Sequence, residues 1–397
     1  MKHAVLALSS WHRWANWKAR TEHRIYADKQ YQLALKHAQQ LVATADCEDI
    51  DKVLAACIVF ICFEGVRGNH KASQLHMDNG RAIARQYASH FKSQSRRKDL
   101  VEIHDALARL DIQALTYSDV HSPYRYTLDD FLDTDPSLLP WDFKDVYEAR
   151  NSLVDMSRWM MIIGHYVDVV DTDLETRYQA NKATCYARLR QWYCGFEKVV
   201  ETADPTTELL VLCLRQFYHT CQAISIGAVQ GPRTVWDEAL SHSAKIVEYS
   251  EAIVQRLDTA DGEISFSYDI GYTIGAFLAA TVCRDPDLRR RAIKVLRVVP
   301  RQEGRWASRP ASAIAQRWME IEEDGLTDVN SAADIPDARR VRFIDTHVDV
   351  LSETAEVAYM LPSPNGEGYV PRRERLIWTN ATGGLHRAES YRYEEGY

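Results

Sequence analysis

Residues 53–63 read Val-Leu-Ala-Ala-Cys-Ile-Val-Phe-Ile-Cys-Phe, a run in which every side chain is apolar. Because the run is apolar on nearly every side of a helix, the sequence predicts a helix that is buried over most of its surface. Gly65 and Gly68 follow where a helix end is expected, and Asn69 is a suitable N-cap for the next helix. This stretch therefore predicts the centre of a helical core.

Helical periodicity also dominates the rest of the chain. Ala34, Ala38 and Leu41 recur at the spacing of an amphipathic stripe. Gly271 and Gly275, four residues apart, would let a neighbouring helix approach closely. Further helical patterns cover residues 98–112, 144–174, 178–200, 206–226, 233–257, 265–282, 286–298 and 310–324. Since strand-like alternation is scarce, we predict an all-α fold, a large solenoid-like array of antiparallel helix pairs.

Two segments break the helical pattern. Residues 117–142 are rich in proline, aspartate and serine, which predicts a loop excursion. Prolines and glycines also crowd the chain after residue 358. We therefore predict one helical domain over residues 1–325, followed by an irregular and partly disordered extension over residues 326–397.

The composition excludes several classes of protein. The 397 residues carry 48 Lys and Arg against 56 Asp and Glu, a net charge of −8, which disfavours a chain that wraps duplex DNA through clustered cations. An apolar content of 46% excludes wholesale disorder. The eight cysteines form no C-x2-C pair, and no run is long and apolar enough for a signal peptide or membrane span. We expect no metal, no cofactor and no membrane association.

One acidic string raises an enzymatic alternative. Asp129, Asp130 and Asp133 form a DDxxD pattern, which in an all-α protein can hold Mg²⁺ against a diphosphate, as terpene synthases do. The string lies in the proline-rich excursion, and no second metal-binding triad follows it. A second acidic group, at Asp168, Asp171 and Asp173, lacks a nearby histidine. We therefore expect a protein that is not an enzyme.

The most basic stretch spans residues 284–305. It offers candidate contacts to phosphates or to an acidic partner: Arg289, Arg290, Arg291, Lys294 and Arg297. A simpler interpretation is an ordinary amphipathic helix, in which Leu288, Ala292 and Val295 are buried and the cations face water.

Four blocks of sequence, taken in order, resemble one family. They are residues 3–34 (His3–Leu8, His12-Arg13, Tyr31-Gln32 and Ala34), residues 56–80 (Ala56–Glu64, Arg67-Gly68-Asn69, His76 and Gly80), residues 148–153 (Glu148-Ala149-Arg150 and Leu153) and residues 283–323 (Cys283–Ile293, Pro300-Arg301, Glu303-Gly304, Trp306, Trp318 and Glu322-Glu323). This order is similar to the middle regulatory region of fungal zinc-cluster (Zn2Cys6) transcription factors. The resemblance covers residues 3–325.

The resemblance implies a nuclear or nucleocytoplasmic regulator that contacts proteins of the transcription machinery or itself. It also implies a small-molecule effector of unknown identity and a role in secondary-metabolite gene control. Members of the family carry a six-cysteine cluster upstream, and no such cluster occurs in these 397 residues. We therefore expect no direct DNA contact by this chain.

Several alternatives stay open at this point. The chain is a natural protein without a zinc cluster, the product of a truncated gene model, or a shortened form. A helical interaction scaffold with no transcriptional role is a third functional alternative, beside the regulator and the terpene-synthase-like enzyme. Target genes and oligomeric state do not follow from the sequence.

Overall fold

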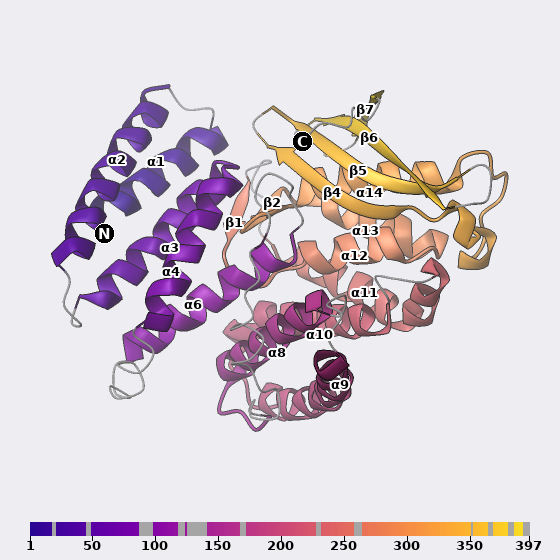
Figure 1. Ribbon diagram of the computed structural model, residues 1–397, viewed down its shortest axis with the longest axis horizontal. Helices are drawn as coiled ribbons and strands as arrows, with labels where there is room; N and C mark the ends of the chain where they lie inside the picture. The colour runs from indigo at the N-terminus through magenta and orange to yellow at the C-terminus, as the bar shows by residue number, and fades with distance from the viewer. Residues whose placement is uncertain are drawn as a thin grey trace.

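The computed structural model describes residues 1–17, 21–44, 49–86, 98–117, 124, 141–166, 172–227, 232–257, 264–350, 352–363, 368–379 and 385–391. Most of these residues are helical, which confirms the all-α prediction in its main part, but the described residues also form two small sheets. Figure 1 shows three helical groups, with a twisted sheet over the C-terminal one. The arrangement of the helix pairs as a solenoid stays a prediction.

The N-terminal group is built around the apolar run. Its helices are α1 (Lys2–Trp17), α2 (Thr21–Thr44), α3 (Ile50–Val66), α4 (His70–Gln86) and α6 (Lys98–Leu115). Phe63 of α3 is fully buried, and its ring stacks on Tyr31 of α2 at 4.5 Å between centroids. Trp11 of α1 meets the edge of Phe63 at 6.1 Å. The prediction of a nearly all-buried helix at residues 53–63 is confirmed.

The central group follows with longer helices. These are α8 (Val146–Tyr166), α9 (Thr172–Val200), the short 3-10 turn η2 (Pro205–Thr207), α10 (Glu208–Ile226), the 3-10 segment η3 (Arg233–Ala239) and α11 (Leu240–Arg256). Trp192 is fully buried between α8 and α9, and its Nε1 donates to the Ala149 carbonyl at 2.8 Å. The helix predicted over residues 233–257 begins instead as a 3-10 segment and becomes α-helical at Leu240.

The third group contains α12 (Thr273–Val282), α13 (Pro286–Val298) and α14 (Ser308–Glu323). A Cβ atom on Gly275 would overlap the side chains of Gln216 and Thr220 on α10, so this glycine permits the close helix contact that the sequence predicted. The predicted helix over residues 265–282 was too long. Residues 265–267 form strand β1 (Ser265–Ser267), which pairs in parallel with β2 (Arg301–Glu303).

The C-terminal part corrects the prediction of an irregular extension. After the short turns η4 (Ala332–Asp334) and η5 (Asp337–Arg339), four strands form an antiparallel sheet in chain order. They are β4 (Arg342–Asp349), β5 (Thr354–Pro362), β6 (Tyr369–Trp378) and β7 (Leu385–Tyr391). Pro362 and Gly368 flank the β5–β6 connection. Pro371 of β6 pairs with Met360 of β5 and lies outside the part of β6, residues 373–378, that pairs with β7. The prolines and glycines that suggested disorder therefore mark a hairpin.

The sheet packs one face on α14, as Figure 1 shows. Leu376 and Trp378 of β6 are buried together with Trp318 of α14. Arg317 of α14 donates from Nε and Nη2 to the Glu374 carboxylate at 2.7 and 2.8 Å. Both apolar burial and a bidentate ion pair therefore join the sheet to the helices.

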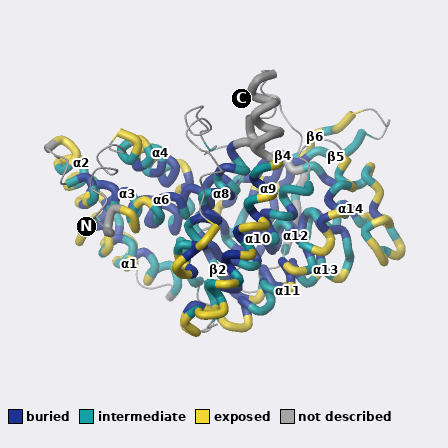
Figure 2. Tube along the Cα trace, turned by 90° about the horizontal axis from the view of Figure 1, so that it is seen from below, coloured by how far each residue is buried: buried dark blue, intermediate teal, exposed yellow. Residues whose placement is uncertain are grey.

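The buried positions run through the interior from α3 to α14, and the exposed positions follow the outer turns (Figure 2). No helix within the described ranges combines the length and the apolar character that a bilayer span requires. Much of the 117–142 segment lies outside those ranges.

We predict that Phe60→Ala destabilises the protein by about 3–5 kcal/mol, because it removes a buried ring and leaves a cavity. Phe60 is 4% exposed and contacts the rings of Tyr31 and His76. Urea unfolding followed by circular dichroism measures the change. The control Leu75→Ala, at a residue that is 58% exposed, should change stability little. Equal effects of the two substitutions would contradict the position of α3 in the core.

Candidate functional site

A short hairpin lies where the N-terminal and C-terminal helices meet. It consists of β2 and β3 (Trp306–Ala307), which pair in antiparallel register. Gly304 at the turn has φ +56°, a left-handed conformation that favours glycine. A Cβ atom there would overlap the side chain of Gln113 on α6. The turn therefore requires glycine both for its backbone and for its contact.

The hairpin is hydrogen-bonded to three N-terminal helices. Gln302 donates from Nε2 to the Gly65 carbonyl of α3 at 2.7 Å. Arg305, which is 5% exposed, donates to Gln74 of α4. Trp306 donates from Nε1 to Thr116 Oγ1, just after α6, at 3.1 Å. These bonds join segments more than 180 residues apart in the chain.

Glu303 connects the same hairpin to α12. Its buried carboxylate accepts hydrogen bonds from the backbone N–H groups of Tyr272 and Thr273 at 3.1 and 3.0 Å. These donors lie at the amino end of α12, where the helix dipole favours a negative charge. Arg301 Nε donates to the same carboxylate at 2.8 Å. A Cβ atom on Gly271 would overlap the carboxylate, so this glycine is required at that position.

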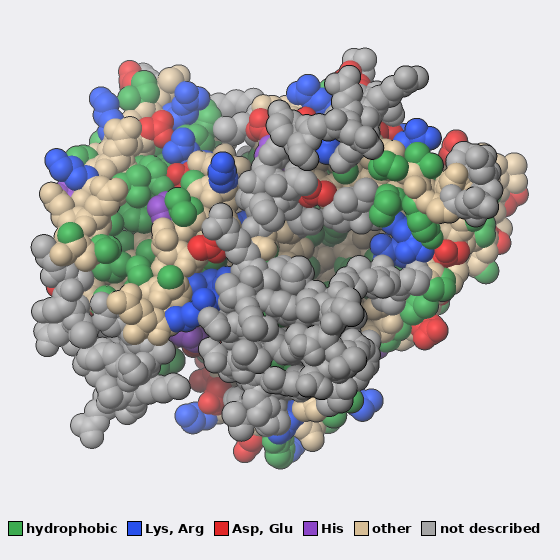
Figure 3. Space-filling view, in the orientation of Figure 1, with side chains coloured by type: hydrophobic (Ala, Val, Ile, Leu, Met, Phe, Trp, Pro, Cys, Tyr) green, Lys and Arg blue, Asp and Glu red, His purple; other side chains and the backbone are tan. Residues whose placement is uncertain are grey.

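A cavity of about 320 Å³ lies beside the hairpin. Figure 3 shows a recess near the centre of the face turned toward the viewer, over the region of α12. The wall of the cavity is largely apolar and is drawn from α6, α8, α10, η3, α12, β3, α14 and β4. The apolar residues that define it are Ile274, Phe277, Leu278, Trp306, Ile314 and Val348. A volume of this size lies at the lower end of the range for small-molecule pockets.

The charged part of the wall is cationic. Arg233, Arg284 and Arg305 line the cavity, and no aspartate or glutamate is among its described lining residues. Burial, together with the positive charges of Arg284 and Arg342, lowers the pKa of Arg233 to about 10. Arg233 therefore stays charged at neutral pH.

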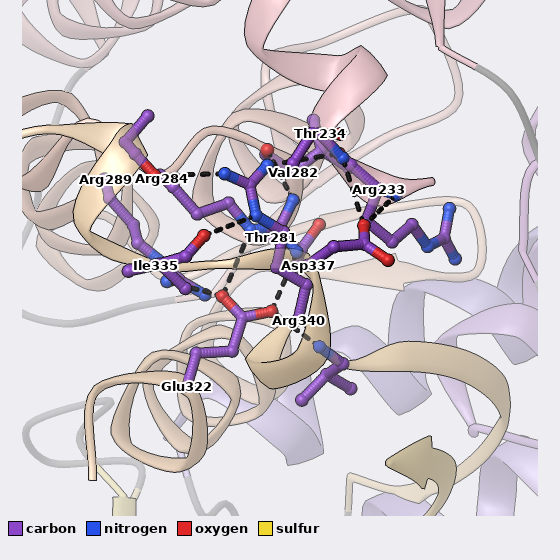
Figure 4. Close-up of polar contacts among 12 residues, drawn as sticks. Arg233, Thr234, Thr281, Val282, Arg284, Arg289, Glu322, Ile335, Asp337 and Arg340 are labelled. Atoms are coloured by element: carbon purple, nitrogen blue, oxygen red, sulfur yellow. Dashed lines mark hydrogen bonds and ion pairs between the residues drawn. The ribbon is translucent and has the colours of Figure 1, made fainter. Parts of the chain in front are cut away.

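Glu322 of α14 balances part of this charge (Figure 4). Arg284 donates to it from Nε and Nη2 at 3.1 and 2.7 Å, and Arg289 Nη1 lies 2.8 Å from Glu322 Oε2. The N–H group of Val341 donates to Glu322 Oε1 at 2.8 Å. All three side chains are at most 2% exposed. One carboxylate therefore holds α13, the α12–α13 connection and the entry to β4.

A second pair fixes the position of η3. Arg340 is 1% exposed and donates to both carboxylate oxygens of Asp237 at 2.7 and 2.8 Å. Asp337 accepts from the backbone N–H groups of Arg233 and Thr234. The segment that carries Arg233 is thereby held against the start of the sheet, as Figure 4 shows.

The candidate contact residues of the basic stretch fall on α13. The carboxylate of Asp285 caps this helix by accepting from the Leu288 N–H at 3.0 Å, and Pro286 occupies its first turn. Ala292, Ile293, Val295 and Leu296 are buried, as an amphipathic helix requires. The predicted helix over residues 286–298 is confirmed.

The cations of α13 differ in their surroundings. Arg289 is fully buried against Glu322, so it contributes to the fold and lies away from the surface. Arg290 pairs with Glu323 at 2.5 Å, and Arg291 pairs with Glu251 at 2.9 Å. Arg297 donates to Ser312 at 3.0 Å. Lys294 is exposed.

The acidic candidates cannot be placed. Asp129, Asp130, Asp133, Asp168 and Asp171 lie outside the described residues. Within the described part of the chain, no group of three or more His, Cys, Asp or Glu side chains is arranged to hold a metal ion.

Comparison with known proteins gives one match. Residues 1–182 match the family described as fungal specific transcription factor domain. The resemblance to the regulatory region of fungal transcription factors is thereby confirmed over these residues. No curated protein and no solved structure shows a significant match to the chain.

The cavity was not foreseen from the sequence. Its described lining residues come from eight elements that lie up to about 230 residues apart, and each apolar residue alone suggests only core packing. The Pro300–Trp306 block did stand out in the sequence, and it supplies Arg305 and Trp306 to the wall. The basic stretch over residues 284–305 was a second signal, because it supplies Arg284 and Arg305 to the wall.

We predict that Glu322→Gln destabilises the protein by about 3–5 kcal/mol, because it leaves two buried guanidinium groups without their carboxylate. The control Glu323→Gln, whose partner Arg290 is half exposed, should cost at most about 1 kcal/mol. Chemical unfolding at neutral pH measures both values. Similar costs for the two substitutions would contradict the role assigned to Glu322.

The stability cost of Glu322→Gln should also depend on pH. Burial acts to raise the pKa of Glu322, but Arg284 and Arg289 outweigh it and the pKa lies below its ordinary value of 4.5. The stabilisation is therefore complete above pH 4.5 and is lost as the pH falls through the lower, folded-state pKa. The stability difference between the wild type and Glu322→Gln should narrow in that acidic range.

Proposed function

We propose that this chain is the regulatory domain of a fungal transcription regulator, which acts through protein contacts in the nucleus. The observation that carries the proposal is the match of residues 1–182 to the fungal specific transcription factor domain. In this function the chain contacts the transcription machinery or a second copy of itself. Control of secondary-metabolite genes is the finer part of the proposal, and it rests on the resemblance alone.

The architecture supports a regulatory role. The hairpin forms hydrogen bonds with α3, with α4 and with Thr116 just after α6, all within the family-matched residues. On its other side it accepts a hydrogen bond from the amino end of α12. A contact made on one part can therefore be transmitted to the other through buried polar groups. The family-matched segment also exposes large apolar side chains on α2, including Tyr26 and Leu33, seven residues apart. Such side chains are typical of surfaces that partners cover.

We further propose that this chain does not contact DNA directly. Its net charge is −8, and three of the α13 cations, Arg289, Arg290 and Arg291, already have carboxylate partners. Within the proposed function, the exposed cations Arg290, Arg291 and Lys294 are candidate contacts to an acidic protein partner. Arg289 is excluded from this set by its burial.

Two alternatives are weaker. The enzyme alternative rests on Asp129, Asp130 and Asp133, and no observation within the described residues favours it. A helical scaffold without a transcriptional role shares the same fold, so it differs from the proposal only in its location and its effect on transcription.

A tethering experiment tests the proposal. Residues 1–397 are fused to a heterologous DNA-binding domain in a fungal reporter strain, and reporter transcription is compared with that of the DNA-binding domain alone. We expect the fusion to change reporter transcription, because the chain recruits partners to the promoter. The tagged chain without that domain should accumulate in the nucleus. An unchanged reporter, or exclusion of the chain from the nucleus, would contradict the proposal.

The same assay examines the cations of α13. Arg290→Gln combined with Lys294→Gln should weaken the reporter effect if these residues contact the partner. Lys52→Gln on α3, whose side chain is 61% exposed, is the matched control and should leave the effect intact. A full effect in the double variant would remove α13 from the contact surface and leave the proposed function standing.

A further inference from the structure

The cavity beside the hairpin has the features of a binding site. Its walls are mainly apolar, and aromatic rings of Phe277, Trp306 and Trp318 are among them. A space of about 320 Å³ is much larger than the packing defects of an ordinary core, in which voids seldom exceed a water molecule. A folded protein that contains an apolar cavity of this size becomes more stable when an apolar molecule fills the cavity.

The cationic end of the cavity sets the charge of its occupant. Arg233 and Arg284 both line it, and Arg289 and Arg342 lie behind them. The charges of Arg284, Arg342, Glu322 and Asp337 act on Arg233, and those of Glu322 and Glu323 act on Arg289. Among the described lining residues, the charged side chains are those of Arg233, Arg284 and Arg305. An anion placed beside these arginines would gain favourable electrostatic energy at low local dielectric.

A buried donor points to the same conclusion. Trp236 of η3 lines the cavity and is 7% exposed, and its Nε1 has no hydrogen-bond acceptor among the described residues. A buried donor without an acceptor costs free energy, which an acceptor atom on a ligand would recover. Arg233 and Trp236 belong to the same 3-10 segment, so both donors are held on one side of the cavity.

We propose that this cavity binds a small organic anion, with an aromatic or aliphatic body between α12, α14 and β4 and an acidic group at Arg233 and Trp236. The apolar wall excludes a multiply charged ligand such as a nucleotide, which would leave most of its phosphate oxygens without partners. The inference stands on the cavity and is independent of the proposed transcriptional function.

Calorimetric titration of the full chain with two matched probes tests the proposal. 2-Naphthoate carries the apolar body and the acidic group, and 2-naphthylmethanol carries the same body without the charge. The wild type should bind the carboxylate more tightly than the alcohol. Arg233→Gln should weaken carboxylate binding by about tenfold or more, as expected for a charge-assisted hydrogen bond, and leave alcohol binding nearly unchanged.

Two further variants locate the binding. Leu278→Trp places a larger side chain in the cavity wall and should abolish binding of both probes. Arg256→Gln removes a partly exposed guanidinium of α11 outside the cavity and should leave both affinities unchanged. Circular dichroism confirms that each variant is folded before its titration.

The opposing outcomes are equally specific. Equal affinity for the two probes, or no loss in Arg233→Gln, would overturn the assignment of an anionic ligand. Full binding in a folded Leu278→Trp variant would place the probes elsewhere. No binding of either probe to the wild type would overturn the proposal for organic anions of this size. None of these results would bear on the reporter experiment, because the tethered chain needs no added ligand.

Discussion

The rest of the structure depends on the hydrogen bonds that the buried carboxylate of Glu303 accepts. This carboxylate receives the first N–H groups of α12 and the guanidinium of Arg301, and it does so from a hairpin bonded on its other side to α3 and α4 and to Thr116, just after α6. A buried charge is tolerated only when donors surround it, so the carboxylate fixes the position of each donor in turn. The two ends of the helical array are therefore held by one short segment.

This constraint also places the cavity. Arg305, Trp306 and Ala307 of the hairpin form part of the cavity wall, and α12, which Glu303 caps, supplies Phe277, whose ring centroid lies 5.2 Å from that of Trp306. On the far side, Glu322 anchors the entry to β4 through the N–H group of Val341. A molecule bound in the cavity would contact elements held by both carboxylates, so its presence would favour the arrangement in which both networks are intact.

Much of the fold could be predicted from local patterns. The apolar run at residues 53–63, the cap and stripe of residues 285–298, and Gly275 each express their structure within a few residues of sequence. The sheet could not be predicted in the same way, because the prolines and glycines of its β5–β6 connection resemble those of a disordered tail. Its strands are stabilised by packing on α14, which a local pattern does not reveal.

The candidate site shows the same division. The basic stretch was visible as a run of arginines, but only the fold separates buried Arg289 from exposed Arg290. The cavity needs residues from α6 to β4, so no single segment could indicate it. The Pro300–Trp306 block was visible through its resemblance to a family, yet its role as the connection between two helical groups depends on partners such as Gln74 and Gly65.

Hydrogen–deuterium exchange of Gly304→Ala tests the central claim most directly. Gly325→Ala is the matched control, because Gly325 has a similar φ of +70° but open space around its Cα, whereas a Cβ on Gly304 would overlap Gln113. If the hairpin joins the two helical groups, exchange should rise in both α6 and α12 of Gly304→Ala and in neither helix of Gly325→Ala. A rise confined to residues 301–307, or equal in the two variants, would contradict the account.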